Sequence, residues 1–389
     1  MRLIRSIWHF AWALFSAASC GFPSRRLTVI GITGTKGKST TLELLSGMFE
    51  EAGARTALLS SVYVKVGAER RRNLTGNSMP GRGSIQRFLR SAVRAGCRFA
   101  LIEVTSQGVL QHRHRFIAFD AGGVTNLAPE HIEAHGSFTA YRDAKLAFFR
   151  AVARSPKTSR HLFVREDDEA VSPFAAVAPS ITIRFALEGT LMPPGAFGEV
   201  NAENAALAAA IARWFGVSEE AIGSALRKFR GLPGRMEFIQ QEPFGVVVDY
   251  AHTPDSLTKV YAALRKDYGG LVCVVGAAGG GRDRWKRSAM GSAAATHCRF
   301  VVVTDEDPYD EDPAAILDDV ERGFKERNFS SYEKILDRRA AIRRALALAR
   351  PGEAVVFTGK GSETGIHRAH GAVEPWSETE EVRAALKDI

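Results

Sequence analysis

The stretch GITGTKGKST at residues 31–40 combines glycines with lysines and hydroxyl side chains, directly after the β-rich run LTVI. Glycines let backbone N–H groups approach phosphate oxygens, and the helix that follows favours negative charge at its N-terminus. Lys38 is suited to neutralise two phosphates, and the Ser39 hydroxyl to reach Mg²⁺. Gly31 and Gly37 are separated by five residues, where the standard phosphate-loop motif has four. The predicted nucleotide contacts are Gly34, Thr35, Gly37, Lys38, Ser39 and Thr40.

Three more chemically capable side chains follow predicted strands. Glu103 ends the run FALIEV, His131 follows VTNLAPE, and Lys145 lies in a helix that begins near Thr139. Sites in α/β proteins form at the carboxyl ends of strands, so these residues are candidates for the same site. Each alone also has an ordinary explanation as a strand-end carboxylate, a loop histidine or a surface lysine.

The elements that would position these residues alternate along the chain. LTVIGI, TALLS and FALIEV are short β-rich runs, separated by helical patterns from Ser39 to about Ala52 and near 84–95. This alternation predicts an α/β fold in which helices cover both faces of a parallel sheet.

A second α/β series follows a break. Residues 201–229 have a helical pattern, and GLPGR at 231–235 interrupts it with two glycines and a proline. FGVVVDY, LVCVVGA, FVVVTD and AVVFTGK then read as further strands. The predicted segments are an apolar N-terminal extension at 1–27, a phosphate-loop domain at 28–232 and a second α/β domain at 233–389.

The composition is that of a globular protein long enough for two domains, with 389 residues, 45% apolar and 24% charged. Lys and Arg number 52 against 43 Asp and Glu, and the net charge of +9 favours anionic partners or a basic solvated surface. No basic run is interleaved with aromatic residues, so no nucleic-acid groove is predicted.

The four cysteines, Cys20, Cys97, Cys273 and Cys298, are widely spaced and contain no CxxC pair. Neither a disulfide framework nor a zinc site is therefore expected. This cysteine usage favours a reducing, cytoplasmic location.

The N-terminal segment MRLIRSIWHFAWALFSAASC superficially resembles a signal peptide. Its apolar stretch is too short to span a bilayer, and the phosphate loop begins soon after it. We predict one helix that packs on the protein, contacts a partner protein or lies on a membrane surface. Its large apolar residues are Ile7, Trp8, Phe10, Trp12, Leu14 and Phe15.

Together these motifs resemble those of the Mur ligases, the ATP-dependent amino-acid ligases of peptidoglycan synthesis. Within the family they resemble the branch that adds the third residue to UDP-N-acetylmuramoyl-dipeptide. The resemblance implies a central ATPase domain followed by a Rossmann-like C-terminal domain. The matching stretches, in family order, are GITGTKGKST, EVTSQ, TNLAPEHIEAHGSFTAYRDAK, NAEN, PGRMEF, VDYAHTPDSL, GGGRDRWKRSAMG, TDEDPYDEDP and GKGSE.

The resemblance also implies residue roles. Lys145 matches a lysine that the family carbamylates, which converts an ammonium into a carboxylate-like Mg²⁺ ligand. The implied catalytic residues are Lys38, Glu103, His131 and Lys145, and the implied magnesium ligands are Ser39, Glu103, His131 and carbamylated Lys145. The implied ATP contacts beyond the loop are Asn126, Asn201, Asn204, Arg235 and Asp249, and the implied substrate contacts are His252, Arg282, Glu306, Asp307 and Glu363.

The sequence departs from the family pattern in two main places. Only about 27 residues precede the phosphate loop, too few for the UDP-sugar-binding domain expected there. Members that select diaminopimelate carry Asp-Asn-Pro-Arg where this chain has Glu306 to Tyr309. The acidic residues Asp307, Asp310, Glu311 and Asp312 predict either an amine-bearing amino acid such as lysine or a solvated acidic loop. Smaller departures are Lys36, Gln107 and Ser362.

The expected activity is therefore amide formation through an acyl phosphate, on a peptidoglycan-precursor peptide or a related carboxylate. A synthase of polyglutamate or another amino-acid polymer is the alternative within the enzyme class. A non-catalytic ATP-binding relative is the alternative outside it, and Lys38, Glu103, His131 and Lys145 argue against it.

Overall fold

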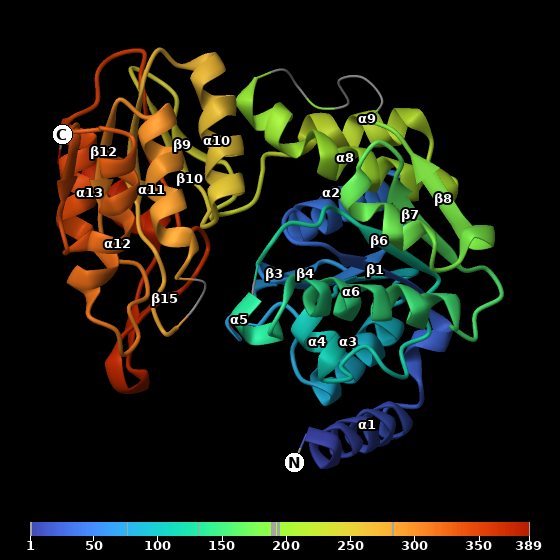
Figure 1. Cartoon of the computed structure of the whole chain (residues 1–389). Helices are drawn as coiled ribbons and strands as arrows, with labels where there is room; N and C mark the ends of the chain where they lie inside the picture. Colours follow the sequence, from blue (N-terminus) through green and yellow to red (C-terminus); the bar gives the residue numbers. More distant parts are fainter. Residues whose placement is uncertain are drawn as a thin grey trace. The chain divides into compact units, whose positions relative to one another are not determined.

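The computed structural model describes residues 2–75, 77–130, 132–187, 192, 195–281 and 284–388. The chain forms two compact units (Figure 1), the first from Met1–Pro193 and Asn201–Arg230, and the second from Pro194–Val200 and Gly231–Ile389. The sequence pattern did not assign residues 194–200 to the second unit. Both units have the expected α/β architecture.

The first unit is built on one sheet with the strand order β4-β3-β2-β5-β1-β6-β7-β8. All neighbours pair in parallel except β2–β3 and β3–β4, which are antiparallel. The strands are β1 (Thr28–Thr33), β2 (Thr56–Leu59), β3 (Tyr63–Val66), β4 (Glu69–Arg72), β5 (Phe99–Glu103), β6 (Ala121–Val124), β7 (His161–Arg165) and β8 (Thr182–Phe185). Because β1, β5 and β6 are adjacent and parallel, their carboxyl ends meet at one edge, where the candidate residues follow.

One continuous apolar core joins this sheet to the helices at residues 82–94, 106–110, 138–153 and 172–175. The helices are α1 (Arg2–Ser19), α2 (Lys38–Glu51), α3 (Arg82–Arg94), α4 (Ser106–Leu110), α5 (Ile132–His135), α6 (Phe138–Ala153), α7 (Ser172–Ala175), α8 (Ala196–Trp214) and α9 (Glu219–Lys228). A Cβ on Gly31 would lie 2.5 Å from the Phe148 ring. Gly31 therefore lets α6 pack closely on β1 and belongs to the strand, which explains the long glycine spacing of the loop motif.

The second unit contains a sheet with the order β13-β12-β11-β14-β10-β9, parallel except for β9. Its strands are β9 (Glu237–Gln240), β10 (Gly245–Val248), β11 (Leu271–Val275), β12 (Phe300–Val303), β13 (Tyr332–Lys334) and β14 (Ala354–Phe357), with the separate pair β15 (Gly365–His367) and β16 (Val373–Pro375). Its helices are α10 (Pro254–Asp267), α11 (Lys286–His297), α12 (Pro313–Glu326), α13 (Arg338–Ala347) and α14 (Glu378–Leu386). Apolar cores cover both faces of the sheet.

The structure differs from the sequence expectations in local details. The predicted continuous helical stretch at 201–229 is two helices, α8 and α9, separated at residues 215–218. The hairpin β3–β4 and the strands β7 and β8 were not predicted. ERRR in β4 lacks an apolar run, whereas HLFVR in β7 contains one that was overlooked.

The cysteine expectation needs a correction. Cys273 on β11 and Cys298 after α11 form a disulfide across 25 residues, with Cα atoms 6.1 Å apart. The sequence did not indicate this pair, because the two side chains come together only through the packing of α11 beside β11. Cys20 and Cys97 are free thiols.

Candidate functional site

The loop between β1 and α2 has the tight backbone that phosphate binding requires. Gly34 (φ 138°) and Gly37 (φ 82°) both adopt conformations that favour glycine. A Cβ would lie 1.9 Å from Thr125 Oγ1 at Gly34 and 1.9 Å from Asn204 Oδ1 at Gly37. Both positions therefore exclude any side chain on steric grounds as well.

The end of β6 holds this loop in place. Asn126 accepts hydrogen bonds from the Thr35 N–H at its backbone oxygen (3.0 Å) and from the Lys36 N–H at Oδ1 (2.9 Å). Thr125 Oγ1 donates to the Lys36 carbonyl (2.6 Å), and Lys36 Nζ pairs with Glu130 Oε1 (2.7 Å). Asn126 is thus a loop-positioning residue in this structure, and the extra charge of Lys36 is balanced by a carboxylate.

A hydroxyl–carboxylate pair lies at the start of α2. Ser39 Oγ donates to Glu103 Oε2 at 2.7 Å, and the Ser61 N–H donates to the same oxygen at 2.9 Å. Both Ser39 and Glu103 are buried. Two hard oxygen donors beside a phosphate loop fit Mg²⁺, which usually takes few protein ligands and completes its shell with water and phosphate. The described residues hold no cluster of three or more His, Cys, Asp or Glu side chains that suits a metal.

Two lysine side chains converge on one carbonyl of the loop. Lys38 Nζ donates to Gly34 O (3.1 Å) and Thr35 O (2.9 Å), and Lys145 Nζ donates to Gly34 O (2.6 Å). Lys145 is buried on α6, and its Nζ lies 4.5 Å from the centre of the Tyr141 ring. Burial, and after it the charge of Lys38, lowers the pKa of Lys145 well below its usual value. Its burial excludes the alternative explanation of Lys145 as an ordinary surface lysine.

The remaining first-unit candidates lie around the same loop. Asn204 and Asn201 are buried on α8, with Asn204 Nδ2 3.5 Å from Asn201 Oδ1. Thr41 Oγ1 contacts Asn204 Oδ1 at 3.4 Å, so the asparagine pair lies beside the first turn of α2. Thr40, in that turn, is also buried. His131 lies outside the described residues.

The structure adds residues that the sequence interpretation missed. Ser61 follows β2 at the same edge of the sheet as Glu103, a position that the strand pattern could have indicated. His135 Nε2 lies 3.1 Å from Ser106 Oγ, and the Tyr141 hydroxyl lies 3.2 Å from Thr35 Oγ1. The last two pairs join segments 29 and 106 residues apart, so local sequence gave no signal for them.

In the second unit, a buried charge cluster follows β12 and β14. Lys360 Nζ donates to Asp307 Oδ1 (2.9 Å) and Glu363 Oε2 (2.7 Å), and the Tyr250 hydroxyl donates to Glu363 Oε1 (2.8 Å). Burial acts to lower the pKa of Lys360, but Glu363 and Asp307 outweigh it and raise that pKa. The cluster therefore keeps an ammonium between two carboxylates at the carboxyl edge of the sheet.

Glu306 lies beside this cluster and is buried. Among the described residues its Oε2 has no hydrogen-bond partner. A Cβ on Gly359 would lie 2.4 Å from this oxygen, which shows how closely the loop after β14 covers it. Burial raises the pKa of Glu306 to about 7, with Lys360 acting in the opposite direction.

This pKa predicts a pH-dependent stability. Because folding raises the pKa of Glu306, its protonated carboxyl contributes its full stability to the fold only below the unfolded pKa near 4.5. This contribution to stability is lost as pH rises through the folded pKa of about 7. Glu306→Gln should therefore gain stability relative to the parent protein between about pH 5 and pH 8, by on the order of 3 kcal/mol. Urea unfolding at the two pH values measures this change. Exposed Glu380→Gln is the control, and an equal offset for Glu306→Gln at both pH values would contradict the prediction.

Asp249, Arg235 and His252 form a second group, which borders β10. Asp249 accepts backbone N–H bonds from Met236 and Ala251, each at 2.7 Å. The Arg235 guanidinium lies over the Tyr250 ring at 4.0 Å, and His252 Nδ1 lies 2.6 Å from the Tyr250 carbonyl. In this structure Asp249 fixes the turn that carries Arg235. Arg282 lies outside the described residues.

The acidic run around Tyr309 is accounted for by structural contacts. Asp310 Oδ1 accepts from the His370 N–H, Glu311 accepts from the Gly281 N–H and Arg287, and Asp312 caps α12 through the Ala314 N–H. Tyr309 stacks on His367 with ring centres 5.1 Å apart. These contacts explain the acidic residues without an amine-bearing ligand.

Family models match both units. The model described as the Mur ligase middle domain matches residues 32–191, and the model described as the Mur ligase, glutamate ligase domain matches residues 234–361. A UDP-N-acetylmuramyl-tripeptide synthetase from Roseiflexus sp. (strain RS-1) is 36% identical, over 97% of this chain and 82% of the relative. The enzyme with the same description from Deinococcus radiodurans is 34% identical, over 96% and 81% of the two chains.

Solved structures give a consistent result. A UDP-N-acetylmuramoyl-L-alanyl-D-glutamate–2,6-diaminopimelate ligase has a TM-score of 0.60 at 27% identity, covering 93% of this chain and 78% of that one. A folylpolyglutamate synthase from Mycobacterium tuberculosis, complexed with ADP and AMPPCP, has a TM-score of 0.72 at 18% identity, covering 90% and 92%. At that identity the second likeness concerns the fold alone.

Proposed function

Because the chain belongs to the Mur ligase family and is an ATP-dependent, ADP-forming carboxylate–amine ligase, we propose that it adds an amino acid to a peptidoglycan-precursor peptide. The acceptor in this proposal is the UDP-N-acetylmuramoyl-dipeptide that the names of its relatives indicate.

The observation that supports the site assignment most strongly is the arrangement around Gly34. Its carbonyl oxygen accepts from both Lys38 and Lys145, and the Ser39–Glu103 pair lies at the start of the adjoining helix. This arrangement places the Lys38 ammonium and hard oxygen donors where the loop would hold the γ-phosphate of ATP. Asn201 and Asn204 would then lie on the adenine side.

The reaction follows in two steps. A carboxylate oxygen of the acceptor attacks the γ-phosphorus of ATP, a new O–P bond forms, and the bond to ADP breaks. The amine of the incoming amino acid then attacks the acyl carbon, phosphate leaves and the amine loses a proton. Lys38 offsets negative charge on the transferring group, and the loop N–H groups orient it. A bound Mg²⁺, held by Ser39 and Glu103, would neutralise phosphate charge.

Lys145 is proposed to act as a carbamate. Only an uncharged amine attacks CO₂, and burial together with Lys38 favours the uncharged form of Lys145. The product is an anion, which would be stabilised beside Lys38 and would provide a further oxygen ligand for Mg²⁺. His131 remains a proposed member of this metal site.

The second unit is proposed to bind the amino acid and part of the nucleotide. The Lys360–Asp307–Glu363 cluster and Glu306 can pair with the ammonium and carboxylate of an amino acid. Arg235 suits a phosphate and Asp249 a ribose hydroxyl, and Arg282 and His252 remain proposed substrate contacts. Because the carboxylates of the acidic run already have partners within the protein, they do not identify the amino acid that is added. Lysine remains one candidate.

The proposed location is the cytoplasm, where ATP and nucleotide-linked precursors are available. Within the described residues, every helix is too short or too polar to cross a membrane. Peripheral contact of α1 with a membrane or a partner protein is compatible with this location.

A direct assay tests the proposed function. The purified protein is incubated with ATP, Mg²⁺, UDP-N-acetylmuramoyl-dipeptide and single amino acids, and ADP release and product mass are measured. We expect ADP release that requires both the acceptor and one amino acid, and a product heavier by that amino acid less water. Lys38→Ala is the inactive control.

Two outcomes would favour the alternatives. ADP release with a folate or glutamate chain in place of the nucleotide-linked peptide would indicate a polyglutamate-type synthase. ATP binding without acceptor-dependent ADP release, for any candidate pair, would indicate a non-catalytic relative.

A further inference from the structure

The N-terminal helix α1 packs in an unusual way. It lies against α3 at the edge of the first unit (Figure 1), and the side chains buried in this packing are the small residues Ala13, Ser16 and Ala17. Several of its described large apolar side chains are exposed instead, with Trp8 64% and Phe15 61% exposed, while Phe10 packs on Phe116. A helix that only completed the protein core would bury its largest apolar side chains.

The outward side chains form a continuous stripe. Trp8 stacks on Trp12 with ring centres 6.0 Å apart, and Trp12 stacks on Phe15 at 5.5 Å. Ile7, Phe10 and Leu14 extend the exposed surface. Tryptophan and other aromatic side chains are favoured at the boundary between lipid head groups and acyl chains.

The surroundings of this stripe carry arginine and almost no acid. Residues 1–27, 82–98, 104–119 and 144–160 contain no Asp or Glu. Asp120, the first carboxylate after the third segment, is paired with Lys157 at 3.2 Å. The exposed arginines of these segments are Arg25, Arg26, Arg87, Arg90, Arg94, Arg98, Arg115, Arg150 and Arg154. Such a surface attracts anionic lipid head groups.

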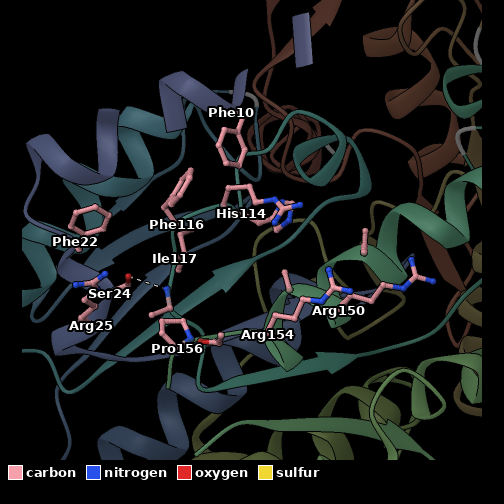
Figure 2. A pocket seen from close by; sticks show the side chains of 15 residues that line it. Phe10, Phe22, Ser24, Arg25, His114, Phe116, Ile117, Arg150, Arg154 and Pro156 are labelled. Carbon is pink, nitrogen blue, oxygen red and sulfur yellow. Dashed lines mark hydrogen bonds between the residues drawn. The ribbon is translucent and has the colours of Figure 1, made fainter. Parts of the chain in front are cut away.

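A pocket of about 370 Å³ lies beside α1, and both aromatic and arginine side chains line it. Figure 2 shows its aromatic side chains, Phe10, Phe22 and Phe116, together with Arg150 of α6 and Arg154, which directly follows α6. Phe10 contacts Phe116 edge to face at 5.1 Å, and Arg25 lies over the Phe22 ring at 4.7 Å. Guanidinium groups beside apolar walls suit a phosphate that is attached to a hydrocarbon chain.

We propose that α1 and this pocket form a peripheral binding site for a membrane that contains anionic phospholipid. The Trp8–Trp12–Phe15 stripe enters the boundary of the acyl chains, and the arginines around the pocket bind head-group phosphates. A second copy of the chain fits this surface poorly, because a symmetric contact would bring two sets of arginines together without carboxylates. The proposal does not depend on the ligase substrate.

Vesicle co-sedimentation of the full chain tests this site. The parent protein should sediment with vesicles of phosphatidylcholine and phosphatidylglycerol, sediment much less with phosphatidylcholine alone, and be released by salt. Trp8→Glu/Phe15→Glu should weaken binding at least tenfold. Trp214→Glu, at a 49% exposed tryptophan of α8, is the matched control and should bind as the parent does.

The arginine contribution is measured separately. Arg150→Gln/Arg154→Gln should lose several-fold affinity for the anionic vesicles, while Arg343→Gln/Arg350→Gln removes the same charge from exposed positions of the second unit and should not. Absence of binding by the parent protein, or unchanged binding by Trp8→Glu/Phe15→Glu, would overturn the proposal. A dimer of the parent protein that this double variant dissociates, without vesicle binding, would assign the surface to a second copy instead.

Discussion

Replacing Lys145 by alanine is expected to reduce acceptor-dependent ADP release by about 10²–10³-fold or more, the loss typical for a preorganised electrostatic group. The side chain is buried on α6 and reaches the loop at Gly34. No other described side chain donates to that carbonyl from α6, so alanine removes both this hydrogen bond and the proposed carbamate. ATP binding should survive, because the N–H groups of the loop remain.

Chemical rescue distinguishes the carbamate from an ordinary lysine. A short carboxylic acid such as formate should restore part of the Lys145→Ala rate, because it supplies the missing anionic oxygen. Labelled CO₂ should give a carbamate carbon signal in the parent protein and none in the variant. Lys228→Ala, at a lysine that is 68% exposed, is the control. An unchanged rate in Lys145→Ala would exclude the proposed role.

Replacing Arg338 by methionine is expected to destabilise the second unit by about 3–5 kcal/mol, because it leaves a buried carboxylate without its positively charged partner. Arg338 and Glu378 are 1% and 0% exposed and form a two-pronged ion pair at 2.9 and 2.7 Å. Arg338 also donates to Asp305 O and Thr358 O, each at 2.8 Å. It therefore joins α14 to the ends of β12 and β14.

An exposed pair in the same unit provides the control. Arg344 and Glu333 form an ion pair at 2.6 Å, with 43% and 37% of the side chains exposed. Arg344→Met should cost less than about 1 kcal/mol, because water screens this pair. Urea unfolding measures both variants. Equal losses for Arg338→Met and Arg344→Met would show that burial does not determine the strength of the Arg338 pair.

Much of the first-unit site could be predicted because its signals are local. The glycines, Lys38 and Ser39 lie within ten residues, and the end of an apolar strand marks Glu103. Contacts between distant segments had no such signal. The Ser61 bond to Glu103 and the Asn126 bond to Lys36 arise because β2, β5, β1 and β6 are neighbours in the sheet.

In the second unit, the sequence identified candidate residues but not the contacts between them. Asp307 and Glu363 were candidates, yet Lys360 between them was missed, as was the disulfide of Cys273 with Cys298. The acidic run near Tyr309 left open an amine-bearing amino acid or a solvated loop, and the structure shows its carboxylates accepting from backbone N–H groups and Arg287.

The amino-acid sequence alone determined the fold class, the phosphate loop and the family, because these depend on short-range patterns of glycine, charge and apolar residues. The tertiary structure determined which side chains are buried and how burial shifts their pKa values. Burial makes Lys145 a weak base and Glu306 a weak acid, because an ionised group loses hydration inside the protein. It also decided that α1 packs through its small residues and leaves its aromatic side chains exposed, since only the neighbouring helix α3 determines which face is buried.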